Sequence, residues 1–112
     1  MPEKPLALVV GVGPTTGTRV CRLLAERYTL ALVARSAERI DALAAELADA
    51  HAYPCDVGDR KRWGDTLLRI RAERGVPSRI LVNTESAQWG AYHALSLAQF
   101  AASFDVNAVS LL

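Results

Sequence analysis

Short apolar runs without polar alternation mark the strands that the chain is expected to form. The segment Leu6–Val10 reads LALVV and is ended by the glycine-rich segment Gly11–Gly17. Similar runs lie at Leu30–Ala34 and Ile80–Val82, and a weaker one, which contains a proline, lies at His51–Cys55. Continuous apolar sequence is typical of strands covered on both faces, whereas proline favours the edge of a sheet. The pattern therefore predicts four strands, with the third at an edge.

Helical periodicity fills the intervals between these runs. Ser36 and Asp59 are placed to cap the second and third helices, and the third is expected to end at Gly75. Ser96 and Gln99 form a capping box for a last helix that continues into the C-terminus. The expected apolar faces comprise Val20, Leu23, Leu24 and Arg27 or Tyr28; Ile40, Leu43, Ala44 and Leu47; Trp63, Leu67 and Ile70; and Leu97, Phe100, Ala101 and Phe104.

The alternation of strands and helices predicts the architecture. Parallel strands joined by helices require right-handed crossovers, so we expect an open α/β sheet with the strand order 3-2-1-4 and helices on both faces. No linker or repeat interrupts residues 1–112, which are read as a single, partial domain. Ligands of such sheets bind beyond the carboxyl ends of the strands, here between the first and fourth.

Composition narrows the classes of function. The 112 residues contain 13 Lys plus Arg and 12 Asp plus Glu, and this balance gives no positive field for nucleic acid or anionic lipid. Cys21 and Cys55 lie far apart, with no Cys/His spacing typical of a metal site. No apolar stretch reaches bilayer length. We expect a cytoplasmic protein that binds neither nucleic acid, membrane nor metal.

The segment Gly11–Gly17 is the first candidate site. It lies between the first strand and the first helix, where the backbone can approach a pyrophosphate and the helix N-terminus can face it. Its third glycine comes one residue later than in GxGxxG, and any tight strand-to-helix turn uses glycine. The context favours a nucleotide loop over an ordinary turn.

The same segment resembles the TGxxxGxG motif of the short-chain dehydrogenase/reductase family. Gly11 and Gly17 match its first and last glycines, whereas Val10 replaces its Thr and Thr15 stands at its middle glycine. Thr15 and Thr16 could supply hydroxyl donors instead. The resemblance implies a Rossmann-like fold, truncated before its later strands, and a dinucleotide cofactor contacted by Gly11, Gly13, Thr15, Thr16 and Gly17.

The end of the second strand reads Ala34-Arg35-Ser36. At this place an acidic side chain would bind the ribose 2′-hydroxyl of NAD, whereas an arginine accommodates the 2′-phosphate of NADP. No acid stands at Ala34, and the planar fork of Arg35 suits a phosphate. We therefore expect NADP(H) rather than NAD(H), with Arg35 and Ser36 as contacts. The alternative is an ordinary exposed arginine in a helix-capping turn.

Two more segments resemble cofactor motifs of the family. Asp56 and Val57 are similar to an Asp-Val pair that binds the adenine edge, although Asp56 could simply end a strand. Asn83 matches one residue of an Asn-Asn-Ala-Gly segment that lines the cofactor ribose, where Glu85 and Ser86 replace Ala and Gly.

The catalytic residues of the family are expected downstream. Asn107 matches the asparagine that supports a proton-relay water, and it could equally satisfy backbone groups at a helix kink. None of the tyrosines, Tyr28, Tyr53 and Tyr92, is followed by a lysine four residues later, as the family's Tyr-x-x-x-Lys pair requires.

Three hypotheses remain open. The first is the NADP(H)-binding portion of a short-chain dehydrogenase/reductase-type oxidoreductase, inactive by itself. The second, motivated by Thr15, Glu85 and Ser86, is a non-catalytic nucleotide-binding or subunit-interaction module. The third is a piece of a longer enzyme. Because strand Arg79–Asn83 would lack a neighbour, we expect a homo-oligomer joined through that edge or through the Leu97–Leu112 helix.

Overall fold

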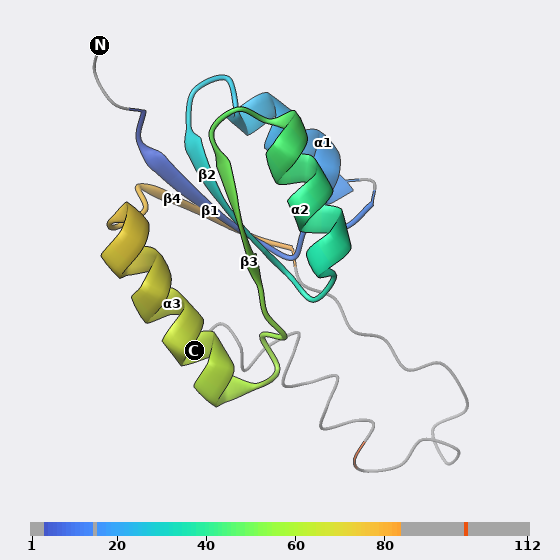
Figure 1. Cartoon of the computed structure of the whole chain (residues 1–112), viewed down its shortest axis with the longest axis vertical. Helices are drawn as coiled ribbons and strands as arrows, with labels where there is room; N and C mark the ends of the chain where they lie inside the picture. The colour runs from blue at the N-terminus through green and yellow to red at the C-terminus, as the bar shows by residue number, and fades with distance from the viewer. Residues whose placement is uncertain (1–3, 15, 84–97, 99–112) are drawn as a thin grey trace.

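Four parallel strands form one sheet in the part of the chain that the computed structural model describes, residues 4–14, 16–83 and 98. Figure 1 shows their order, β3-β2-β1-β4, which confirms the expected topology. The strands are β1 (Leu6–Val10), β2 (Thr29–Ala34), β3 (Ala50–Pro54) and β4 (Arg79–Val82), and the helices are α1 (Thr16–Leu24), α2 (Ala37–Glu46) and α3 (Arg60–Arg74).

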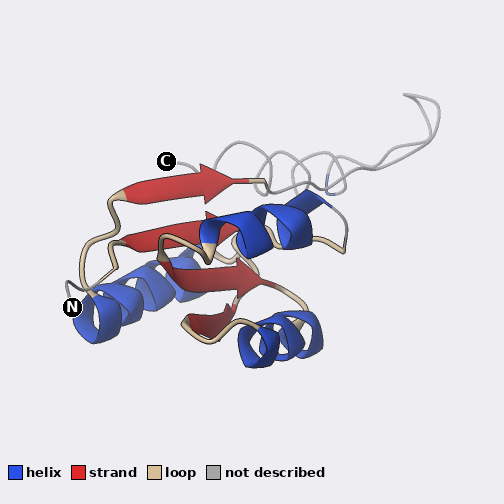
Figure 2. Cartoon of the chain, turned by 90° about the horizontal axis from the view of Figure 1, so that it is seen from above, coloured by secondary structure: helices blue, strands red, loops and turns tan. Residues whose placement is uncertain are grey.

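Helices cover both faces of the sheet, with α1 and α2 on one side and α3 on the other (Figures 1 and 2). All five residues of β1 are buried, as its unbroken apolar sequence predicts. Alternate residues of β1 enter two separate cores. Val9 packs with Cys21 and Ile40 beneath α1 and α2, whereas Leu8 packs with Ile70 beneath α3.

The helix ends follow the capping signals. The Ser36 hydroxyl accepts a hydrogen bond from the Arg39 amide, and Asp59 Oδ1 accepts one from the Arg62 amide. Gly75, with φ of 98°, ends α3 in a conformation that glycine adopts readily. The predicted starts of α2 and α3 and the predicted end of α3 are therefore confirmed.

Two side chains expected on apolar helix faces lie outside the core. Leu23 is 70% exposed because Gly17 and Cys21, four residues apart, face the sheet, and a residue two positions further on points away. Leu67 is 38% exposed, at the margin of a face centred on the buried Ile70. The helix expected from Ser96 onward lies outside the described residues, apart from one helical position at Ala98.

Strand β4 differs from the other strands in burial. It pairs with β1 in parallel, yet all four of its residues are exposed, including Ile80 at 61%.

Within the described ranges, no helix is long and apolar enough to cross a membrane.

Candidate functional site

An open cleft of about 770 Å³ lies at the carboxyl edge of the sheet. Residues that follow each of the four strands line it, which is where open α/β sheets bind ligands. The expected contacts that the structure describes all line this cleft: Gly11, Gly13, Thr16, Gly17, Arg35, Ser36, Asp56, Val57 and Asn83. Thr15 and Asn107 lie outside the described residues.

The glycine loop joins β1 to α1 by a close backbone approach. Gly11 has φ of 90°, which favours glycine, and its amide donates a 2.8 Å hydrogen bond to the Val33 carbonyl. A Cβ on Gly17 would lie 3.0 Å from Val12 Cα and 3.2 Å from the Gly11 carbonyl oxygen. The first turn of α1 therefore packs directly against the backbone of the glycine loop. No acidic residue occupies that turn.

Thr18 holds the middle of this loop in place. Its hydroxyl donates a 2.7 Å hydrogen bond to the Gly13 carbonyl, so the side chain is directed toward the loop. Gly13 has open space where a Cβ would stand. The loop thus presents backbone, with little side-chain bulk, to the cleft.

The β2 end of the cleft carries two arginines. Arg35 follows β2 directly and is exposed, and Ala34 leaves no carboxylate at the last strand position. Arg39, in the first turn of α2, is exposed and lines the same cleft. The sequence reasoning did not single out Arg39. Arg39 could have been found from its position three residues after the cap Ser36, because the first turn of α2 must lie near the end of β2 and therefore near the cleft.

Asp56 and Val57 leave β3 in a tight turn. Asp56 Oδ1 accepts a 2.9 Å hydrogen bond from the Gly58 amide, and the Asp56 carbonyl accepts one from the Asp59 amide. Val57 is buried in the core under α3. Asp56 therefore shapes the entry to α3, and its exposed carboxylate also borders the cleft.

Asn83 continues the pairing of β4 with β1. Its amide donates a 2.8 Å hydrogen bond to the Val10 carbonyl, which places the residue beside the start of the glycine loop. Glu85 and Ser86, the departures from the family's segment, lie outside the described residues.

The two cysteines are both buried, and only Cys55 lines the cleft. Cys21 is fully buried behind the loop, and burial raises the pKa of its thiol to about 11, so it is protonated at neutral pH. Cys55 is a buried free thiol at the cleft wall. In the described part of the chain, no three His, Cys, Asp or Glu residues are grouped to hold a metal ion.

The donors around the cleft favour an anionic ligand. Thr16 and Ser36 carry hydroxyls, Arg35 and Arg39 carry guanidinium groups, and the first turn of α1 directs backbone amides toward its N-terminal end. Such groups bind phosphate oxygens by charge-assisted and backbone hydrogen bonds.

Known proteins share both the sequence and the fold. The chain is 32% identical over 115 residues to the 2,3-dihydro-2,3-dihydroxybenzoate dehydrogenase of Bacillus subtilis, an alignment that covers 97% of this chain and 44% of that protein. It superposes on a short-chain dehydrogenase/reductase from Serratia marcescens with a TM-score of 0.86 at 23% identity, covering 97% of this chain and 47% of that one.

A 3-ketoacyl-ACP reductase from Sinorhizobium meliloti has the same fold, with a TM-score of 0.86 at 20% identity over 96% of this chain and 44% of that one. The chain thus spans less than half the length of these relatives. The family profile described as short chain dehydrogenase matches residues 5–112. The protein therefore belongs to the short-chain dehydrogenase family.

Proposed function

We propose that the cleft binds NADP(H) and that the chain is the cofactor-binding portion of a short-chain dehydrogenase/reductase-type oxidoreductase. One observation carries the choice of cofactor. Arg35 lines the same cleft as the glycine loop, and Ala34 stands where an acid would bind the 2′-hydroxyl of NAD. A guanidinium at this position favours the 2′-phosphate of NADP(H).

The described residues fit such a ligand. Gly11 has a positive φ that would strain a residue with a side chain, and a side chain on Gly17 would collide with the backbone of the loop. Glycine at both positions therefore keeps the loop tight, so that its backbone can approach the pyrophosphate. Asp56 and Val57 would contact the adenine, and Asn83 would contact the ribose near β1. When bound, the nicotinamide accepts or donates hydride, and the chain's own residues hold and orient the cofactor.

We expect these 112 residues to bind the cofactor without turning over a substrate by themselves. Short-chain dehydrogenase chemistry needs a proton donor, and none of the tyrosines here precedes a lysine by four residues. The relatives are named as a dehydrogenase and a reductase, which supports an oxidoreductase as the parent activity.

A fluorescence titration with NADPH and NADH tests the cofactor assignment. The chain should bind NADPH more tightly, and Arg35→Ala should remove most of the difference, since a charged hydrogen bond contributes about 1.5–3 kcal/mol. Arg62→Ala, an exposed arginine away from the cleft, is the control and should leave both affinities unchanged. Equal affinities in the parent chain, or a preference for NADH, would remove the NADP(H) assignment.

We further propose that the 112-residue chain associates with a second copy through β4. Ile80, Leu81 and Val82 are 61%, 37% and 39% exposed, and exposed strand edges pair readily. Sedimentation at micromolar concentration should show a dimer, and Ile80→Lys should convert it to a monomer because charge opposes edge pairing. A parent chain that sediments as a monomer would contradict this proposal.

A further inference from the structure

The middle of the glycine loop is held by a side chain that does not itself line the cleft. The Thr18 hydroxyl donates a partly buried 2.7 Å hydrogen bond to the Gly13 carbonyl, a distance typical of a well-formed bond between a hydroxyl and a carbonyl. Thr18 lies in the first turn of α1, and the bond reaches back five residues, past the start of that helix. Gly13 lines the cleft, whereas Thr18 does not. The Gly13 oxygen is therefore directed toward the helix and away from the space that a ligand would occupy.

The direction of this carbonyl matters for an anionic ligand. Proline has no backbone N–H, so the peptide between Gly13 and Pro14 offers an acceptor and no donor. The amides of Gly11 and Val12 are engaged as well, since both donate to the Val33 carbonyl, at 2.8 and 3.4 Å. A phosphate at this loop is therefore served by the amides at the start of α1, and a carbonyl oxygen that faced it would repel it.

The two ends of the loop are held by backbone contacts, but its middle is not packed in this way. Gly11 is bound to the Val33 carbonyl, and the Cβ position of Gly17 lies 3.0 Å from Val12 Cα. At Gly13, by contrast, a Cβ would meet no atom within 4 Å, and glycine leaves the backbone free to adopt many conformations. The hydrogen bond from Thr18 supplies the restraint on this peptide that packing does not supply.

We infer that Thr18 is a positioning residue for the cofactor: its hydroxyl holds the Gly13 carbonyl out of the cleft, so that the loop keeps the shape that accepts a pyrophosphate. The inference rests on the proposed function, but it concerns the part of the ligand that NADP(H) and NAD(H) share. Removal of the hydroxyl should therefore weaken both cofactors by the same factor. Arg35→Ala differs in this respect, because it should act on NADPH through the 2′-phosphate.

The test is a fluorescence titration of the 112-residue chain and three variants with NADPH and NADH. Thr18→Val keeps the branched side chain and removes the hydroxyl, and it should weaken both cofactors about fivefold without changing the ratio of their affinities. Thr18→Ser keeps the donor and should bind both within about twofold of the parent chain. Thr66→Val makes the same change in α3, away from the cleft, and should leave both affinities unchanged. Thermal melting should show that all three variants are folded at the temperature of the titration.

The serine variant separates positioning from packing, because serine lacks the methyl group of Thr18 but keeps its hydroxyl. If Thr18→Val binds both cofactors as the parent does, or if Thr18→Ser loses as much affinity as Thr18→Val, the inference is wrong and the proposed function stands. A loss confined to NADPH would also overturn it, because the hydroxyl would then act on the 2′-phosphate. A parent chain that binds NADPH and NADH equally would remove the NADP(H) assignment alone, and an equal loss of both cofactors in Thr18→Val would still support this role for Thr18.

Discussion

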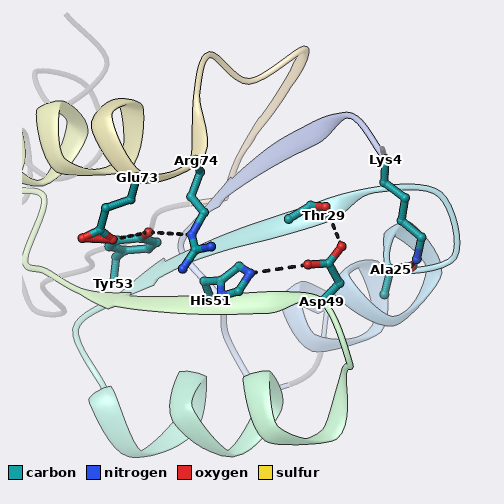
Figure 3. Close-up of polar contacts among 8 residues, drawn as sticks. All are labelled: Lys4, Ala25, Thr29, Asp49, His51, Tyr53, Glu73 and Arg74. Carbon is teal, nitrogen blue, oxygen red and sulfur yellow. Dashed lines mark hydrogen bonds and ion pairs between the residues drawn. The ribbon is translucent and has the colours of Figure 1, made fainter. Parts of the chain in front are cut away.

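The candidate cleft and the contacts between β2, β3 and α3 use their polar side chains differently. At the carboxyl edge, Arg35 and Arg39 border the cleft and form no ion pair within the described residues. Away from the cleft, polar side chains bind one another, as Figure 3 shows for Tyr53, Glu73 and Arg74.

The contacts of Tyr53 tie separate elements together. The buried Tyr53 hydroxyl of β3 donates to Glu73 of α3 at 3.0 Å and accepts from Arg74 Nε at 3.2 Å. The Arg69 guanidinium lies 5.2 Å from the centre of the Tyr53 ring. These contacts satisfy a buried hydroxyl, and they connect α3 to the outer strand of the sheet.

A second group of polar contacts joins β2 and β3 at the amino edge of the sheet. Thr29 donates a 2.6 Å hydrogen bond to Asp49, whose other oxygen lies 3.4 Å from His51 (Figure 3). Since parallel strands all begin at one edge and end at the other, both edges gather several chain segments. The polar contacts of Tyr53 and Asp49 therefore stabilise the fold, whereas Arg35 and Arg39 in the cleft form no ion pair within the described residues.

The largest expected effect comes from Gly17→Val, which alters the carboxyl edge. The new side chain would collide with the backbone of Val12 and Gly11, so dinucleotide binding should be lost and stability should fall by about 1–3 kcal/mol. Titration with NADPH and urea unfolding measure the two effects.

Gly64→Ala is the control for this change. A Cβ on Gly64 meets no atom within 4 Å, and alanine favours a helix interior, so stability should rise by about 1 kcal/mol with binding unchanged. Retained binding in a folded Gly17→Val variant would place the ligand away from the glycine loop.

A smaller effect is expected from Tyr53→Phe, which changes the contacts between β3 and α3. The change removes the hydrogen bonds with Glu73 and Arg74 and should lower the free energy of unfolding by about 1 kcal/mol. NADPH affinity should stay the same, because Tyr53 does not line the cleft. Urea unfolding and titration of the same preparation provide both measurements.

Tyr28→Phe is the matched control, since the Tyr28 hydroxyl makes no hydrogen bond within residues 4–14 and 16–83. It should leave the free energy of unfolding almost unchanged. If Tyr53→Phe instead weakened NADPH binding without destabilising the chain, the proposed division between the cleft and the contacts of Tyr53 would be wrong.

The smallest expected effect is the loss, at acid pH, of the stability that the Asp49 carboxylate contributes. The hydrogen bond from Thr29, followed by the hydrogen bond and charge of His51 and the charge of Lys4, lowers the pKa of this carboxyl. A pKa lowered in the folded state adds stability above the unfolded value, about 4, and that stability is lost as the pH falls through the folded value. The stability advantage of the parent over Asp49→Asn should therefore shrink between pH 5 and pH 3, roughly the range over which such a carboxyl titrates.

Urea unfolding of both proteins across this pH range measures the change. Glu46→Gln provides a comparison on the surface, because the pKa of Glu46 is also lowered, by Arg22, but their hydrogen bond is exposed, whereas the one between Thr29 and Asp49 is partly buried. Its stability difference should be smaller, as solvent screens the pair. A difference for Asp49→Asn that is constant with pH would show that the Thr29 contact does not favour the charged form.

Local sequence determined most of the fold. The apolar runs of β1 and β2, the caps Ser36 and Asp59, and Gly75 each act within a few residues, so their positions can be read along the chain. The strand order followed from the handedness of crossovers, which is a general property of parallel sheets. The glycine loop and Arg35 were found because each directly follows a strand.

Long-range packing set the features that sequence reasoning missed. Arg39 reaches the cleft because α2 begins at its rim, and Leu23 points outward because the rotation of α1 is set by Gly17 and Cys21. The bonds of Tyr53 with Glu73 and Arg74 join residues about 20 positions apart. Such contacts depend on how α3 lies against β3, which no local pattern specifies, because the burial of whole helix faces determines it.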